Sequence, residues 1–170
     1  AWIQHMIWHL SPNGRMGMVL ANGSLSSQTG GEGEIRRKII EDDLVECIIS
    51  LPSQLFYTTG IPVCLWFISK NKKQKGKTLF IDAREMGHMV TRALRELSDG
   101  SENPNDNDIG VLADTYKAFV NGTLQDEQGF CAVVDTEEIA AQDFVLNPAK
   151  YVGVPEQEGD GEPYEEKMER

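Results

Sequence analysis

Apolar residues recur along this chain with two periods, one typical of amphipathic helices and one typical of buried strands. Helical spacing in the opening residues predicts a first helix, which ends at the turn residues 11–14. A second helix is predicted over residues 34–41, with its apolar side chains inward and the basic run 36–38 outward. Continuous apolar runs predict strands buried on both faces, over residues 16–21, 45–51, 63–69 and 78–83.

The order of these elements predicts the fold class. The last two strands are separated only by the polar segment 70–77, so a β-hairpin is expected there. The order predicts a parallel α/β half that finishes in an antiparallel hairpin, followed by a helical extension. In that extension we expect two amphipathic helices, a strand and a short helix opened by a capping box, over residues 86–97, 112–120, 130–134 and 135 onward.

Charge divides the chain into two unequal parts. Residues 1–97 carry 12 Lys and Arg against 9 Asp and Glu, whereas residues 98–170 carry 4 against 18, for a net charge of −11. Only the first part can meet a polyphosphate partner such as DNA, because the second would repel it. We therefore distinguish residues 1–97 from an acidic helical extension of the same domain at 98–155, and expect a flexible tail at 156–170.

Several kinds of chemistry are disfavoured by the sequence. Cys47, Cys64 and Cys131 stand apart within apolar runs, which predicts buried thiols in a reducing cytoplasm and no metal site. His5 and His9 have helical spacing but no third ligand, which favours a simple helix-face pair. No apolar run reaches the ~18 residues needed to span a bilayer, so no membrane partner is expected.

The loop after the second predicted strand carries two adjacent aromatic residues, Phe56 and Tyr57. Aromatic rings at a strand end can stack on a planar base, but spacing alone favours the reading in which one ring fills a gap at the sheet edge. Two basic clusters are candidates for DNA phosphate contact near such a base, with solvated surfaces as the alternative. Their members are Arg36, Arg37, Lys70, Lys72, Lys73 and Lys75.

Five segments in register resemble the modification (methyltransferase) subunits of type I restriction–modification systems, in the C-terminal half of their DNA adenine-N6 methyltransferase domain. The matching runs are 10–23, 33–38, 51–62, 80–83 and 146–152. The resemblance implies that Phe56 packs against the flipped target adenine, with Tyr57 as the second choice. Enzymes of this kind extrude the base from the duplex and must hold it by stacking and edge hydrogen bonds.

The resemblance also implies that residues 1–97 are the C-terminal half of the catalytic domain, with the C-terminal part of a Rossmann-like mixed sheet. It further implies an S-adenosylmethionine-dependent enzyme that acts on DNA with a specificity subunit and a restriction subunit. The family's donor-binding glycine motif and its catalytic Asn-Pro-Pro-Phe motif are both missing from these 170 residues. We therefore expect no catalytic residue here and an isolated chain that is inactive. A non-catalytic interaction module from a truncated methyltransferase-like protein is the alternative. A nucleotide-dependent oxidoreductase is disfavoured, because the sequence has no Gly-x-Gly-x-x-Gly fingerprint.

Overall fold

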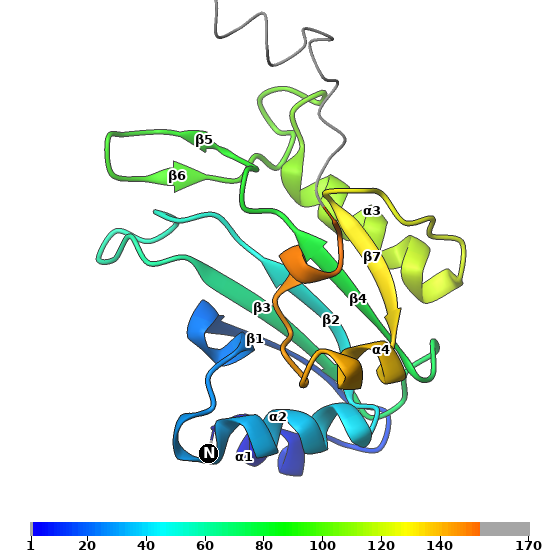
Figure 1. The fold of residues 1–170 in the computed structure, drawn as a ribbon. Coiled ribbons are helices and arrows are strands. Elements are labelled where there is room, and N and C mark those ends of the chain that lie inside the picture. Colours follow the sequence, from blue (N-terminus) through cyan, green and yellow to red (C-terminus); the bar gives the residue numbers. More distant parts are fainter. Residues whose placement is uncertain (1, 154–170) are drawn as a thin grey trace, which may run out of the picture.

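Five strands form one mixed sheet in the computed structural model, which describes residues 2–153 (Figure 1). In chain order they are β1 (Arg15–Ala21), β2 (Val45–Ser50), β3 (Val63–Ser69), β4 (Lys77–Asp82) and β7 (Cys131–Asp135). Their order across the sheet is β1-β3-β2-β4-β7. Strands β2 and β4 pair in parallel, and the other three pairs are antiparallel. The predicted α/β class with a mixed sheet is confirmed.

The predicted hairpin between residues 63–69 and 78–83 is wrong, because β2 lies between β3 and β4. Ile48 of β2 pairs with Trp66 on one side and with Phe80 on the other. All six residues of β2 are buried. A strand with apolar side chains on both faces buries the most apolar surface in a central position, because neighbouring elements cover both its edges and its faces there.

Helices cover both faces of the sheet (Figure 1). They are α1 (Trp2–His9), α2 (Glu32–Glu41), α3 (Asp108–Asn121) and α4 (Thr136–Ala141), with short 3₁₀ turns at Asn22–Leu25, Thr29–Gly31 and Pro148–Lys150. Helices α1, α2 and α4 pack on one face, around Ile48, Trp66 and Phe80. Helix α3 packs on the other face through Leu112 and Phe119. All four helices begin near their predicted positions.

Local chemistry fixes α3 in place. The Asn107 side chain accepts a hydrogen bond from Gly110 N at 2.7 Å and caps the helix start, and Gly122 ends it in the left-handed region at φ 72°. The Tyr116 hydroxyl donates to the buried Glu46 carboxylate at 2.6 Å. Burial and that carboxylate raise the pKa of Tyr116, so the hydroxyl remains a donor that ties α3 to β2.

Two other predictions about elements are corrected. Strand β1 is half-buried on one face and exposed on the other, because it lies at the sheet edge beyond the reach of α3, and Val19 is 50% exposed. Residues 86–97 form a small hairpin and no helix: β5 (His88–Met89) pairs with β6 (Arg95–Glu96). Gly87 has a φ of 80°, and a Cβ there would lie 2.5 Å from Glu96 O, so the hairpin is built around a glycine.

The boundary expected at residue 97 does not separate the sheet, because β7 pairs along β4 (Figure 1). Helix α4 begins at Thr136, but Asp135 makes no side-chain capping bond, so that detail of the expected capping box is wrong. The expected tail at 156–170 lies outside the described residues. Among residues 2–153, no helix is long and apolar enough to cross a membrane.

Candidate functional site

The candidate site lies where three strands of the same direction end. Strands β1 and β2 are both antiparallel to β3, and β2 is parallel to β4. Their carboxyl ends, Ala21, Ser50 and Asp82, therefore meet at one edge of the sheet, which we call the carboxyl edge. Ligands of open α/β sheets bind outside the carboxyl ends of parallel strands. The loops that leave this edge are 22–31, 51–62 and 83–98.

Loop 51–62, the aromatic loop, presents both of its rings to solvent. Phe56 is 41% exposed and Tyr57 is 92% exposed. Leu55, the residue before them, instead packs against the core below. Phe56 forms an isolated bridge with Thr59, whose Oγ1 accepts from Ile61 N at 3.2 Å. A short turn thus holds Phe56 partly sheltered and Tyr57 fully outside.

Backbone hydrogen bonds fix both sides of the aromatic loop. Leu51 N donates to Val63 O at 2.9 Å and extends the pairing of β2 with β3. Arg95 N, in β6, donates to Gln54 O at 2.8 Å and ties the loop to the neighbouring hairpin (Figure 1). Gln54 has a φ of 65°, a conformation that non-glycine residues adopt only when their surroundings hold them. The loop is therefore positioned before any ligand arrives.

The Arg84 side chain is a second feature of this edge, and it was not among the predicted site residues. Its guanidinium forms a two-pronged ion pair with Asp82, with Nε–Oδ1 at 2.8 Å and Nη2–Oδ2 at 2.7 Å. The hydrogen bond to Asp82 raises the pKa of Arg84 further. The pair lines a hollow of about 490 Å³ whose wall includes Phe130. The only signal in the sequence was the spacing of Asp82 and Arg84 just past an apolar strand.

The basic segment 70–77 lies at the opposite edge of the sheet, where β2 and β4 begin (Figure 1). A six-residue strand at about 3.3 Å per residue puts roughly 20 Å between the two edges. Lys73 and Lys75 are exposed, but this separation removes them from the surroundings of Phe56. The expected phosphate contact near the target base therefore finds no support in their position.

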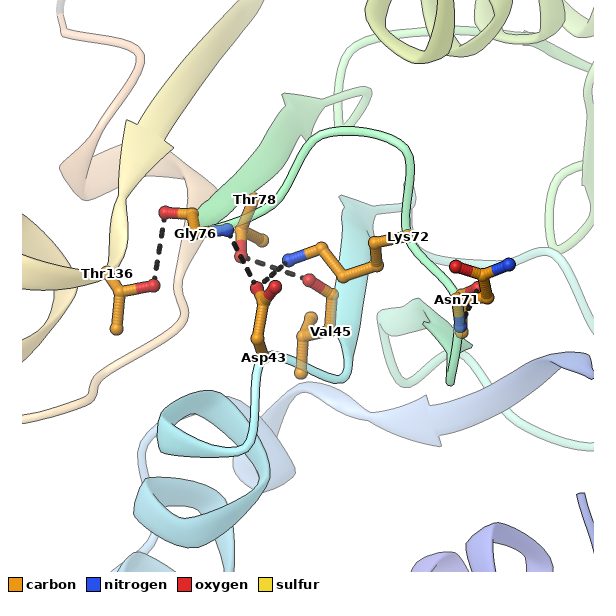
Figure 2. A network of polar contacts seen from close by, with 8 residues as sticks. Asp43, Val45, Asn71, Lys72, Gly76, Thr78 and Thr136 are labelled. Carbon is orange, nitrogen blue, oxygen red and sulfur yellow. Dashed lines mark hydrogen bonds and ion pairs between the residues drawn. The ribbon is translucent and has the colours of Figure 1, made fainter. Parts of the chain in front are cut away.

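Two lysines of the same segment are occupied within the protein. Lys72 is 3% exposed, and its Nζ lies 2.5 Å from Asp43 Oδ1. Figure 2 shows the two side chains pointing toward each other. That carboxylate also accepts from Gly76 N at 3.1 Å. Lys70 Nζ donates to Leu10 O at 2.6 Å. These contacts close the turn between β3 and β4, so the role of Lys72 here is structural.

The arginines of α2 differ from each other. Arg36 is 2% exposed and donates to three backbone carbonyls: Phe144 O at 2.7 Å, Ser27 O at 2.9 Å and Ser24 O at 3.3 Å. The expectation that Arg36 faces outward is wrong, because its guanidinium points inward and donates hydrogen bonds to carbonyl groups of the two loops beside α2. Arg37 is exposed and pairs with Glu41 at 2.8 Å.

The thiols and histidines behave as the sequence indicated. All three cysteines are free and buried, and burial raises the pKa of each thiol, which leaves them unreactive. His9 Nδ1 lies 2.8 Å from His5 O, a contact within one helix. Within residues 2–153, no group of three His, Cys, Asp or Glu side chains is arranged to hold a metal ion.

The outer side of β1 is open. Val19 is 50% exposed on its face, and Trp2 and Trp8 of α1 are 76% and 82% exposed. Strand β1 has only β3 as a neighbour within the described residues. Large exposed apolar side chains beside an unpaired strand edge are typical of a surface that another segment or partner covers.

Comparison with solved structures defines the class of protein. The mixed sheet with helices on both faces is the fold of S-adenosylmethionine-dependent methyltransferases. It is shared with the type I restriction–modification methyltransferase subunit of Streptococcus thermophilus. That structure matches with a TM-score of 0.76 and 27% sequence identity, over 90% of this chain and 29% of that chain.

Sequence comparison then gives the family. The family described as N-6 DNA methylase matches residues 1–160, and this chain belongs to it. The type I restriction enzyme HindI methylase subunit of Haemophilus influenzae is 52% identical over 99% of this chain. The MjaIX methylase subunit of Methanocaldococcus jannaschii is 43% identical over 98% of it. The chain spans 37% and 29% of the lengths of these two relatives.

Proposed function

We propose that this chain forms the target-base side of a DNA adenine-N6 methyltransferase, within the modification subunit of a type I restriction–modification system. The observation that carries the proposal is Phe56, a partly sheltered ring on a fixed loop at the carboxyl edge of the sheet. An adenine turned out of the duplex needs an apolar surface to replace its lost stacking, and an aromatic ring contributes about 1–3 kcal/mol per base. Family membership over residues 1–160 supports this reading over a non-catalytic module.

The methyl donor implied by the family is S-adenosylmethionine. These 170 residues contain neither a glycine-rich donor motif nor an Asn-Pro-Pro-Phe motif, so they do not fit the donor by themselves. We assign donor binding to other parts of the longer proteins to which this chain is similar. The open side of β1, with Val19 and Trp2 exposed, is the surface where such a part would continue the sheet.

The partners we propose are DNA, a specificity subunit and a restriction subunit. The relatives are named as methylase subunits of type I restriction enzymes. Their names as subunits support the proposal that another subunit recognises the DNA sequence.

Substitution of Phe56 tests the proposed function. In the full-length enzyme with its specificity subunit, Phe56→Ala is expected to lower the methylation rate about 5- to 150-fold, which corresponds to the loss of about 1–3 kcal/mol of stacking. Incorporation of labelled methyl groups measures the rate, and 2-aminopurine at the target position reports base extrusion by its fluorescence. Phe56→Trp keeps a stacking surface and should retain most of the activity.

Tyr57→Ala is the matched control, because the neighbouring ring is almost fully exposed and lacks a sheltering wall. We expect it to change the methylation rate less than Phe56→Ala. If Tyr57→Ala abolishes extrusion and Phe56→Ala does not, the roles of the two rings are exchanged. If neither variant changes rate or fluorescence, the aromatic loop is not the base-holding element.

The isolated 170-residue chain gives a second test. We expect calorimetry to detect no S-adenosylmethionine binding at donor concentrations that saturate the full-length enzyme. The physical reason is the lack of any donor motif in the sequence. Micromolar binding by the isolated chain would contradict the assignment of the donor site to another part of the protein.

A further inference from the structure

The hairpin 88–96 projects from the carboxyl edge beside the aromatic loop (Figure 1). Its two short strands pair His88 with Glu96 and Met89 with Arg95. The turn between them is closed by Val90 N, which donates to Leu94 O at 2.9 Å. Thr91 Oγ1 accepts from Leu94 N at 3.1 Å and from Ala93 N at 3.3 Å. The tip therefore has a defined shape and does not depend on a ligand for it.

The base of the hairpin is fixed to the aromatic loop through one residue. Arg95 N donates to Gln54 O at 2.8 Å, and Arg95 Nη1 donates to Met86 O at 3.0 Å and Gly87 O at 3.2 Å. A backbone bond thus joins the hairpin to the segment that carries Phe56. Whatever Phe56 contacts lies beside the surface of this hairpin.

The tip presents apolar groups together with one unpaired cation. Met89 is 42% exposed and Val90 is 50% exposed. Arg92 is exposed and forms no ion pair or hydrogen bond with any residue from 2 to 153. The other arginines in this range all have a carboxylate or carbonyl partner: Arg15, Arg36, Arg37, Arg84 and Arg95.

Charge around the hairpin is uneven. His88 and Val90 share a hollow with Glu96, Asp99, Glu102 and Asp106, whereas Arg92 and the aromatic loop do not line it. No acidic residue occurs in loop 51–62 or between residues 86 and 95, in a chain with a net charge of −11. Arginine binds phosphate oxygens through a planar fork of donors, and such contacts position a protein on a duplex. A two-stranded β-ribbon also has dimensions that a DNA groove admits. A free arginine on a ribbon next to a base-stacking ring fits duplex DNA.

The geometry points to the hairpin 88–96 as a DNA-binding element that lies against the duplex beside the extruded base, with Arg92 contacting a backbone phosphate. This inference rests on the proposed function, because it places the same DNA that Phe56 would contact. Phe56 holds the base, and Arg92 holds the strand next to it. The hairpin keeps the two contacts in register through Arg95.

Arg92→Ala tests the inference in the full-length methyltransferase bound to its specificity subunit. One lost phosphate contact should reduce the slope of log K against log salt by about 0.9, and should weaken DNA binding about 5- to 10-fold at 0.1 M salt. Fluorescence anisotropy over a salt series measures both. Arg92→Lys keeps the charge and should keep most of the slope.

Lys73→Ala is the matched control. Lys73 is an exposed cation at the opposite edge of the sheet, so its removal should leave affinity and slope unchanged. An Arg92→Ala complex with wild-type affinity and slope overturns the inference. Equal weakening by Lys73→Ala also overturns it, because a diffuse electrostatic field would then explain both results.

The proposed function can be distinguished from this inference in the same material. If wild-type methylates adenine and Phe56→Ala loses base extrusion while Arg92→Ala binds DNA normally, the proposed function stands and the hairpin inference fails. If Arg92→Ala instead releases the specificity subunit and leaves DNA binding unchanged, the hairpin is a protein interface and the inference fails. If wild-type does not methylate adenine at N6, the proposed function fails.

Discussion

Arg36→Ala is expected to lower the free energy of unfolding by about 3–5 kcal/mol. The guanidinium donates to the carbonyls of Ser24, Ser27 and Phe144, which belong to two loops on either side of α2. Each carbonyl left buried without a donor costs about 1–3 kcal/mol, and solvent can relieve part of this loss. The Arg36 side chain is 2% exposed, and this burial lowers its pKa from the ordinary value.

Arg37→Ala, one residue further along the same helix, is the matched control. Its guanidinium is exposed, pairs with Glu41 and lies 5.7 Å from the centroid of the Phe144 ring, so the change should stay within about 1 kcal/mol. Urea denaturation followed by tryptophan fluorescence compares the two variants. DNA affinity of the folded Arg36→Ala complex should match wild-type, because the side chain does not reach the surface. Equal stability of the two variants would contradict the structural role of Arg36.

The parts of the fold that follow from local pattern could be predicted. Strand β2 is a continuous apolar run, and its burial on both faces is what such a run requires. Helix α3 has an apolar stripe, and the structure adds a side-chain cap at Asn107 and a terminating Gly122. The three cysteines were expected to be buried within apolar strands, and they are.

The neighbours of a strand could not be predicted, because an apolar run does not specify its partner. The short connection between β3 and β4 suggested a hairpin, but β2 occupies the position between them. The hairpin 88–96 was missed for a different reason. Met86, Met89, Val90 and Leu94 have helical spacing, but Gly87 requires a positive φ and Arg95 N bonds to a distant loop. Both constraints depend on tertiary contacts, which cannot be read from a short stretch of sequence.

The candidate site was predicted unevenly. The resemblance singled out Phe56 and Tyr57, and the structure places both outside the core at the carboxyl edge, where a ligand can reach them. Their roles in base stacking stay predictions. The environments of charged residues were more difficult to predict. Arg36 and Arg37 are the same residue type at adjacent positions, and they differ only in the residues that the fold brings near them. Segment 70–77 looked like one basic surface, yet Lys72 is buried against Asp43.

Asp43→Asn is expected to destabilise the protein by about 3 kcal/mol at neutral pH. Lys72 Nζ is almost fully buried, and Asp43 is the carboxylate that compensates its charge (Figure 2). Removing one partner of a buried pair leaves the other charge without compensation. Asn is the right replacement, because Asp43 has a φ of 54° and Asn tolerates that conformation and can still accept from Gly76 N.

A second substitution shows that the loss comes from the charge. Lys72→Met removes the buried cation and keeps the apolar part of the side chain. In the Asp43→Asn background it should therefore recover most of the lost stability. Lys72→Met alone should cost less than Asp43→Asn alone, since the remaining Asp43 side chain is 26% exposed and can be hydrated. A double variant as unstable as Asp43→Asn would instead assign the loss to the turn backbone.

The pH dependence of the Asp43→Asn effect follows from Lys72. Burial lowers the pKa of Lys72 from 10.5, and the hydrogen bond and charge of Asp43 oppose that shift, so the variant lowers the pKa further. Between the folded pKa and 10.5 the unfolded chain binds more protons, so stability rises with pH in that window, and more steeply in the variant. The loss of unfolding free energy in Asp43→Asn, relative to wild-type, should therefore be largest at pH 7 and smaller at pH 9.5. Urea denaturation at both values measures it, and a deficit that does not change with pH would mean that the Lys72 charge is not its cause.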